Sequence, residues 1–71
     1  MQENHLIDMV KQIDRNLNYE QDLHQRQQMI TDHLQKFWAP RMRVQVQALE
    51  GTEIFAALDD YVQSAILSLR P

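Results

Sequence analysis

The sequence predicts an all-α fold, a small bundle of three to four helices with a proline-marked corner after the second helix. Glycine occurs once and proline twice among the 71 residues, whereas an all-β chain needs such residues at regularly spaced turns. Leucine, glutamine and other good helix formers are frequent instead. Apolar residues recur along the chain at steps of three and four, the period of one helical face. A chain of this length predicts a single helical domain over residues 1–71.

The first helix is expected at about residues 4–17. Asn4 is a suitable N-cap residue, and Asn16 and Asn18 suit the turn that follows, since asparagine tolerates the left-handed conformation. The predicted apolar stripe consists of Leu6, Val10, Ile13 and Leu17.

The second helix has an open start and a defined end. Asp22 with Gln25 three residues later resembles a capping box, but Tyr19 or Glu20 could equally begin the helix. Pro40 disfavours the α conformation at the residue before it, so the helix should end near Trp38. Its apolar series is Leu23, Ile30, Leu34 and Phe37.

Pro40 can occupy the first position of a third helix, because that position needs no backbone N–H donor. Its stripe would contain Met42, Val46 and Leu49. Val44 and Val46 also alternate with polar residues as in a strand, but no other segment provides a partner strand. Gly51 then marks a left-handed helix end.

The last segment is predicted to be one long amphipathic helix. Thr52 is its expected N-cap, and Glu53 would favour the positive end of the helix dipole. The stripe is the most regular in the chain and consists of Phe55, Leu58, Val62, Ala65 and Leu69.

The sequence offers no pattern of catalytic residues, so we expect a protein that is not an enzyme and has no metal site or cofactor. Cysteine is absent, and His5, His24 and His33 form no pair at i, i+4 spacing. His5 and Asp8 could share a metal, although a solvated N-terminal face is the better interpretation. Asp59 and Asp60 would point about 100° apart on a helix and would not converge on a substrate.

The segment between the second and third helices carries the candidate partner-binding residues. Tryptophan and arginine are enriched at binding hot spots. Arginines in the first turn of a helix oppose its dipole, so we expect something other than helix stability to retain them here. In the alternative interpretation the aromatic residues belong to the core and the arginines are solvated or paired to Asp32 or Glu50. The candidates are Phe37, Trp38, Pro40, Arg41, Met42 and Arg43.

Charge and hydropathy narrow the choice of partners and location. The net charge of −3 argues against general nucleic-acid binding, although Arg41 and Arg43 at a helix start could mimic a recognition helix. No apolar run spans a bilayer and the N-terminus lacks the pattern of a signal peptide, so we expect no membrane partner and a cytoplasmic location. A third hypothesis is self-association through the helix from Phe55 to Leu69.

The segment from Asp32 to Arg43, with its Phe-Trp-Ala-Pro-Arg-Met-Arg run, resembles the delta subunit of NAD-dependent formate dehydrogenase. The stretch from Leu6 to Ile13 is similar to the opening helix of that family. Ala39 stands where the family usually has an aspartate that would cap the third helix, and losing such a cap costs about 1 kcal/mol. Residues 19–28 also lack the acidic, alanine-rich loop of the family.

The resemblance implies a non-catalytic accessory subunit that binds the large catalytic subunit of formate dehydrogenase. The parent enzyme oxidises formate at a molybdenum or tungsten pterin centre and passes electrons through iron–sulfur clusters and flavin to NAD. This chain would support assembly, cofactor insertion or stability of the large subunit, and would hold no cofactor. A homodimer of the isolated chain is compatible with this role.

Overall fold

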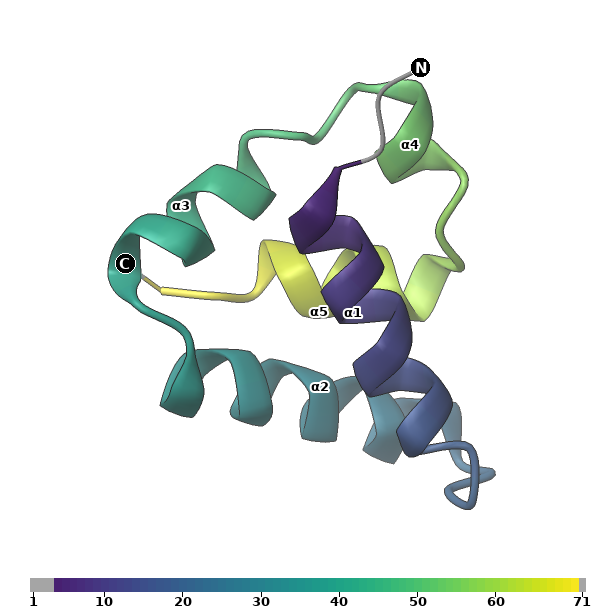
Figure 1. The fold of residues 1–71 in the computed structure, drawn as a ribbon. Helices are drawn as coiled ribbons and strands as arrows, with labels where there is room; N and C mark the ends of the chain where they lie inside the picture. Colours follow the sequence, from purple (N-terminus) through teal and green to yellow (C-terminus); the bar gives the residue numbers. More distant parts are fainter. Residues whose placement is uncertain (1–3, 71) are drawn as a thin grey trace.

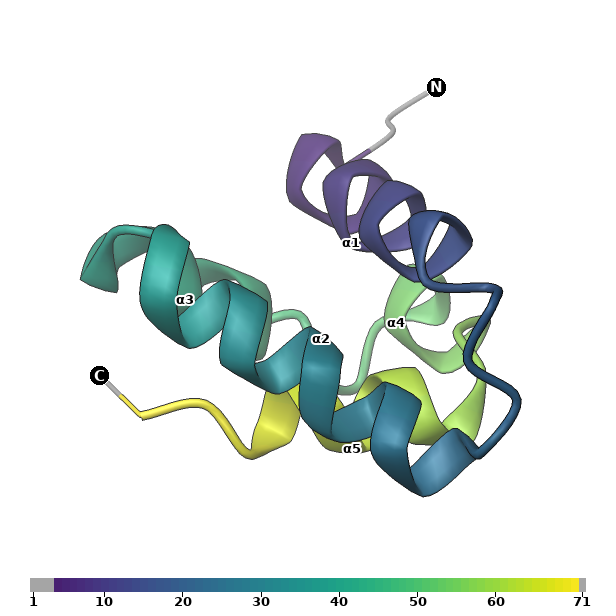
Figure 2. The same cartoon turned by 90° about the horizontal axis from the view of Figure 1, so that it is seen from below.

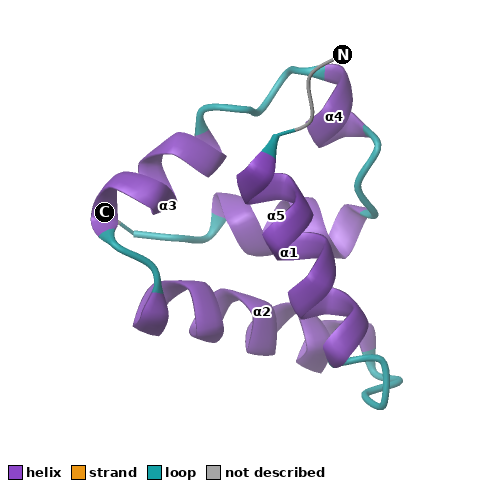
Figure 3. Cartoon of the chain, in the orientation of Figure 1, coloured by secondary structure: helices purple, strands orange, loops and turns teal. Residues whose placement is uncertain are grey.

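The computed structural model describes residues 4–70, and within this range it is all-helical, as the sequence predicts. The five helices in this part of the chain are α1 (His5–Asn16), α2 (Leu23–Phe37), α3 (Pro40–Gln47), α4 (Glu53–Ala56) and α5 (Asp60–Leu67). Figure 3 shows helices joined by short loops and no strand over the described residues.

The last helix, α5, packs against both α2 and α3. α1 also contacts α2 and α3. In Figure 1 it lies in front of α5. Figure 2 shows α2 running alongside α5 in the perpendicular view, with the last described residues returning toward α3. The short α4 lies at the far edge, between α3 and α5 in the chain.

One apolar core joins all five helices. The largest fully buried side chains come from four of them: Val10 of α1, Ile30 and Leu34 of α2, Val46 of α3 and Ile66 of α5. Phe55 of α4 is also buried in this cluster. Burial of a large aliphatic side chain contributes roughly 1.5–3 kcal/mol, and no buried side-chain nitrogen or oxygen in the described residues lacks a hydrogen-bond partner.

Side-chain caps set the starts of α1 and α2. The Asn4 side chain accepts hydrogen bonds from the backbone N–H groups of Leu6 and Ile7, as predicted. Asp22 caps α2 in the same way, which decides the open start in favour of Asp22 over Tyr19 and Glu20. These bonds satisfy N–H donors that have no partner within the helix.

The prediction of a single long helix after Thr52 is wrong, because the chain breaks between α4 and α5. Thr52 caps α4, and the predicted stripe from Phe55 to Leu69 is buried as expected. At the break Asp59 adopts an extended conformation. The Gln63 side chain donates to the carbonyls of Leu58 (2.8 Å) and Ala56 (3.3 Å), which satisfies acceptors that a continuous helix would have bonded internally.

The third helix begins at Pro40 and contains Val44 and Val46, so the helical interpretation of this segment is confirmed. After Gln47 the chain leaves the helix through a turn that ends at Gly51. This glycine has φ +93°, the left-handed conformation that the sequence predicts there.

Ala39 occupies the N-cap position of α3 in an extended conformation and provides no side-chain hydrogen bond. In an Ala39→Asp variant the carboxylate would accept from the N–H groups of Arg41 or Met42 and would favour the positive end of the helix. We expect the free energy of unfolding to rise by about 1 kcal/mol in urea titrations followed by circular dichroism. Ala48→Asp, which adds the same group at the other end of α3, should not stabilise the protein. Equal effects of the two changes would contradict this prediction.

Candidate partner interface

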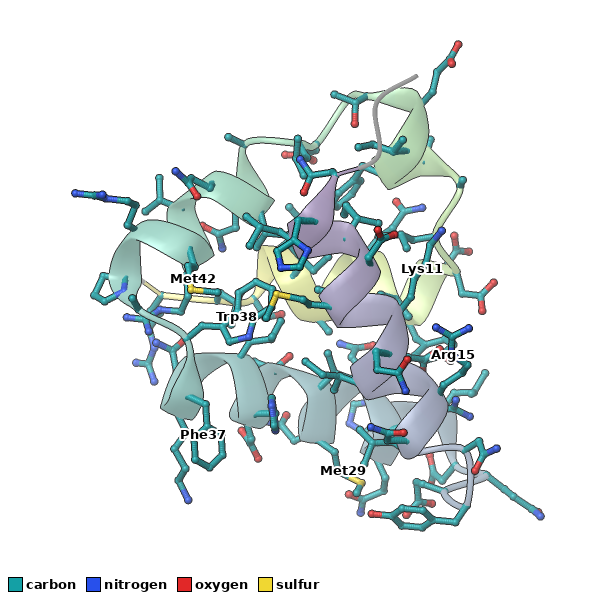
Figure 4. All side chains as sticks on the ribbon, viewed as in Figure 1. Lys11, Arg15, Met29, Phe37, Trp38 and Met42 are labelled. Carbon is teal, nitrogen blue, oxygen red and sulfur yellow. The ribbon has the colours of Figure 1, made fainter. Side chains whose placement is uncertain are left out.

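The corner between α2 and α3 separates two adjacent aromatic residues. Phe37 is 69% exposed, whereas Trp38 is 6% exposed. Trp38 is the C-cap of α2 and has an extended backbone, which turns its side chain to the opposite side from that of Phe37. In Figure 4 Trp38 lies with Met42 on the inner side of the corner, and Phe37 points outward from α2.

The two arginines of the corner also separate. Arg41 is exposed, but Arg43 is buried at 8% exposure. Neither arginine pairs with Asp32 or Glu50, since the one ion pair among residues 4–70 joins Arg26 and Asp14.

The guanidinium of Arg43 binds backbone carbonyls instead of a carboxylate. It donates to the carbonyl oxygens of Trp38, Gln35 (3.3 Å) and Arg70 (2.9 Å). The first two lie at the C-terminal end of α2, where carbonyl groups lack helical partners and the dipole attracts a cation. Arg43 opposes the dipole at the start of α3, but its guanidinium is stabilised by the carbonyl groups at the C-terminal end of α2. This contact explains why an arginine occupies that position.

The structure thus corrects part of the predicted interface. Trp38 and Arg43 were predicted as partner-binding residues, but both are buried within the subunit. The alternative interpretation, in which the aromatic residue belongs to the core, therefore holds for Trp38. Phe37, Pro40 and Arg41 are exposed and Met42 is half-buried, so these residues form the accessible part of the corner.

A groove beside the corner was not predicted from the sequence. It lies between α1 and α2, has a volume of about 330 Å³, and ends at Phe37. Its signal in the sequence is the i, i+4, i+8 series Met29, His33 and Phe37, which runs beside the buried series of α2. We call it the α1–α2 groove, and its lining residues are Ile13, Asn16, Leu17, Met29, Asp32, His33, Lys36 and Phe37.

The hydroxyl groups that could serve as nucleophiles bond to backbone carbonyls. Thr31 lies 3.1 Å from the Ala65 carbonyl oxygen, Ser68 donates to the Ser64 carbonyl, and the Thr52 hydroxyl lies 2.6 Å from the Leu49 carbonyl oxygen. Residues 4–70 contain no group of three histidines or carboxylates that could hold a metal ion. No helix in that range is both long and apolar enough to cross a membrane.

A polar cluster of Asp14, Arg26 and Tyr61 joins α1, α2 and α5. The Asp14 carboxylate accepts from the Tyr61 hydroxyl (2.7 Å) and from Arg26 Nε (2.9 Å). Arg26 also donates to the Asp14 carbonyl, and its guanidinium lies 5.6 Å from the centroid of the Tyr61 ring. Burial, together with the hydrogen bond and negative charge of Asp14, raises the pKa of Tyr61 to about 12.

This pKa predicts a loss of stability in alkali. The folded-state pKa of Tyr61 lies above the ordinary 10.0, so its contribution is complete below pH 10 and is lost as the pH rises toward 12. In a Tyr19→Phe background, ultraviolet titration of the phenolate should show Tyr61 ionising near pH 12. Asp14→Asn should lower this midpoint, whereas Asp8→Asn, which removes an exposed carboxylate from the same helix, should not. A midpoint at the ordinary value would show that the Tyr61–Asp14 bond is absent in solution.

Comparison with known protein families agrees with the family resemblance of the segment from Asp32 to Arg43. A search of curated proteins and a search of solved structures each returned no match. Residues 5–66 match the family described as NADH-dependent formate dehydrogenase delta subunit FdsD. This match covers α1 to α4 and nearly all of α5. The chain therefore belongs to the delta-subunit family of NADH-dependent formate dehydrogenase.

Proposed function

We propose that this chain is a non-catalytic accessory subunit that binds the large catalytic subunit of an NAD-dependent formate dehydrogenase. The observation that carries this proposal is the family match over residues 5–66. The side chains of Thr31, Arg43 and Ser68 donate hydrogen bonds to backbone carbonyl groups, which supports a structural role for these residues. Through binding, the chain supports assembly, cofactor insertion or stability of the large subunit.

The exposed part of the corner is the contact region in this proposal. Phe37 and Arg41 are accessible from solvent and belong to residue types that contribute strongly to interfaces. The α5 stripe is buried in the core, which disfavours self-association through the Phe55–Leu69 segment. The net charge of −3 continues to disfavour a nucleic-acid partner.

Co-expression of a tagged chain with the large subunit tests the proposal. We expect the large subunit to co-purify and formate oxidation to fall when the chain is deleted. A role in cofactor insertion predicts normal levels of large subunit with less bound molybdenum or tungsten. A role in assembly or stability predicts lower levels of the subunit itself. Failure to co-purify together with unchanged formate oxidation would overturn the proposal.

Arg41→Ala should weaken this binding while leaving the melting curve unchanged, because Arg41 is exposed and forms no ion pair among the described residues. A loss of roughly 1–2 kcal/mol, about tenfold in affinity, is the expected scale for a hot-spot residue. Arg15→Ala is the matched control, since Arg15 is an exposed arginine on the outer side of α1. Equal affinity of the Arg41→Ala variant and wild type would remove Arg41 from the interface.

A further inference from the structure

The α1–α2 groove is an apolar hollow at the surface with helices for both walls. Ile13 of α1 and Leu17, the C-cap residue of α1, form one wall, whereas Met29 and Phe37 come from α2. The α2 wall extends from Met29 to Phe37, which is about 12 Å along the helix axis at a rise of 1.5 Å per residue. A groove of this form accommodates about two turns of a third helix by the packing of side-chain ridges into grooves.

The rim of the groove carries charges of both signs. Asp32 and Lys36 lie one helical turn apart on α2, and both are exposed. Asp32 and Lys36 form no ion pair with each other within residues 4–70. The Asp32 carboxylate instead accepts a hydrogen bond from the Gln28 side chain, at 2.9 Å. A ligand segment that carries a basic and an acidic residue one turn apart would complement this rim.

A second copy of the chain does not have the surface to fill the groove. Among the exposed large hydrophobic residues of residues 4–70, Tyr19 and Leu23 are four positions apart, but Tyr19 lies before the start of α2, and no helix contains two of them three or four positions apart. No helix in this range therefore presents an apolar stripe outward, because the stripes of the helices are used in the core. Pairing of two grooves would place hollow against hollow, which leaves apolar surface without contacts.

We propose that the α1–α2 groove binds an amphipathic helix of the large catalytic subunit, with its apolar stripe on Met29 and Phe37. The helix places a basic residue against Asp32 and an acidic residue against Lys36. The groove ends at Phe37, so this contact is continuous with the exposed corner. The inference rests on the proposed function and specifies which surface performs it.

Titration of the full-length chain against the purified large subunit tests the groove. Phe37→Ser should weaken binding at least tenfold, because it removes the outermost apolar side chain of the wall. Leu67→Ser is the matched control, since Leu67 is an exposed apolar residue of α5 outside the groove. Both side chains are exposed, so the two variants should melt like the wild type.

A charge reversal tests the rim separately. Lys36→Glu should weaken binding several-fold and make it less sensitive to salt, whereas Lys11→Glu should have little effect. Lys11 is an exposed lysine of α1 outside the groove, and the two changes alter the net charge equally. Equal weakening by both reversals would mean a general charge effect and would overturn the assignment of the rim.

The outcomes separate the inference from the proposed function. If the wild-type chain binds the large subunit and Phe37→Ser binds equally well, the groove assignment fails and the accessory role remains. If the wild-type chain does not bind, the proposed function fails and the groove assignment with it. If light scattering shows a dimer that Phe37→Ser dissociates while binding to the large subunit is retained, the groove holds a second copy and this inference is wrong.

Discussion

Replacing Trp38 with alanine should unfold most of the isolated subunit. Trp38 is 6% exposed and belongs to the core cluster, and truncation of a buried large aromatic residue costs about 3–5 kcal/mol. A single core in a chain of this size rarely supplies more than about 3–5 kcal/mol in total. Circular dichroism of Trp38→Ala without denaturant should therefore show a large loss of helical signal.

The adjacent residue provides the control for this experiment. Phe37→Ala removes a neighbouring aromatic side chain that is 69% exposed and should change the free energy of unfolding by no more than about 0.5 kcal/mol. Trp38→Phe keeps most of the apolar volume and should be milder than Trp38→Ala. A folded Trp38→Ala variant with near wild-type stability would show that the indole does not support the core.

Arg43→Ala should give the second large loss, about 2–3 kcal/mol in urea unfolding. The change removes the side-chain donor of the Gln35 and Trp38 carbonyl groups, and leaves the Arg70 carbonyl with the Gln35 side chain as its side-chain donor. It also removes a cation from the C-terminal end of α2. Bonds from a charged donor contribute more than neutral ones, and a buried acceptor without a partner is costly.

Two variants distinguish this structural role from a general effect of charge. Arg41→Ala removes the same charge from an exposed position and should leave unfolding nearly unchanged. Arg43→Lys keeps the charge but loses the planar donor group that reaches several carbonyls, so it should recover only part of the stability. If Arg43→Ala and Arg41→Ala unfold alike, the carbonyl contacts of Arg43 contribute little in solution.

The corner therefore has two opposed sides with different expected roles. Trp38 and Arg43 hold α2, α3 and the last described residues together from within. Phe37 and Arg41 face outward and are the residues we propose for partner binding. We therefore propose that buried residues of this short run serve stability and that its exposed residues serve association.

The sequence by itself determined the helical class, the caps at Asn4 and Thr52, the proline start of α3 and the left-handed Gly51. These features depend on a residue and its near neighbours, through helical periodicity, cap hydrogen bonds and backbone sterics. The apolar stripe after Gly51 was also correct, since burial follows from residue type and spacing.

Only the tertiary structure decided the break between α4 and α5, the burial of Arg43 and the presence of the α1–α2 groove. The burial of Arg43 and the groove depend on groups that are distant in the chain, whereas the break depends on side-chain bonds that cross from α5 back to the preceding segment. Gln63 satisfies the carbonyls at the break, and Arg43 reaches the Arg70 carbonyl 27 positions away. A periodic pattern assigns a face to each helix, but the energy of a buried polar group depends on the partner that packing supplies.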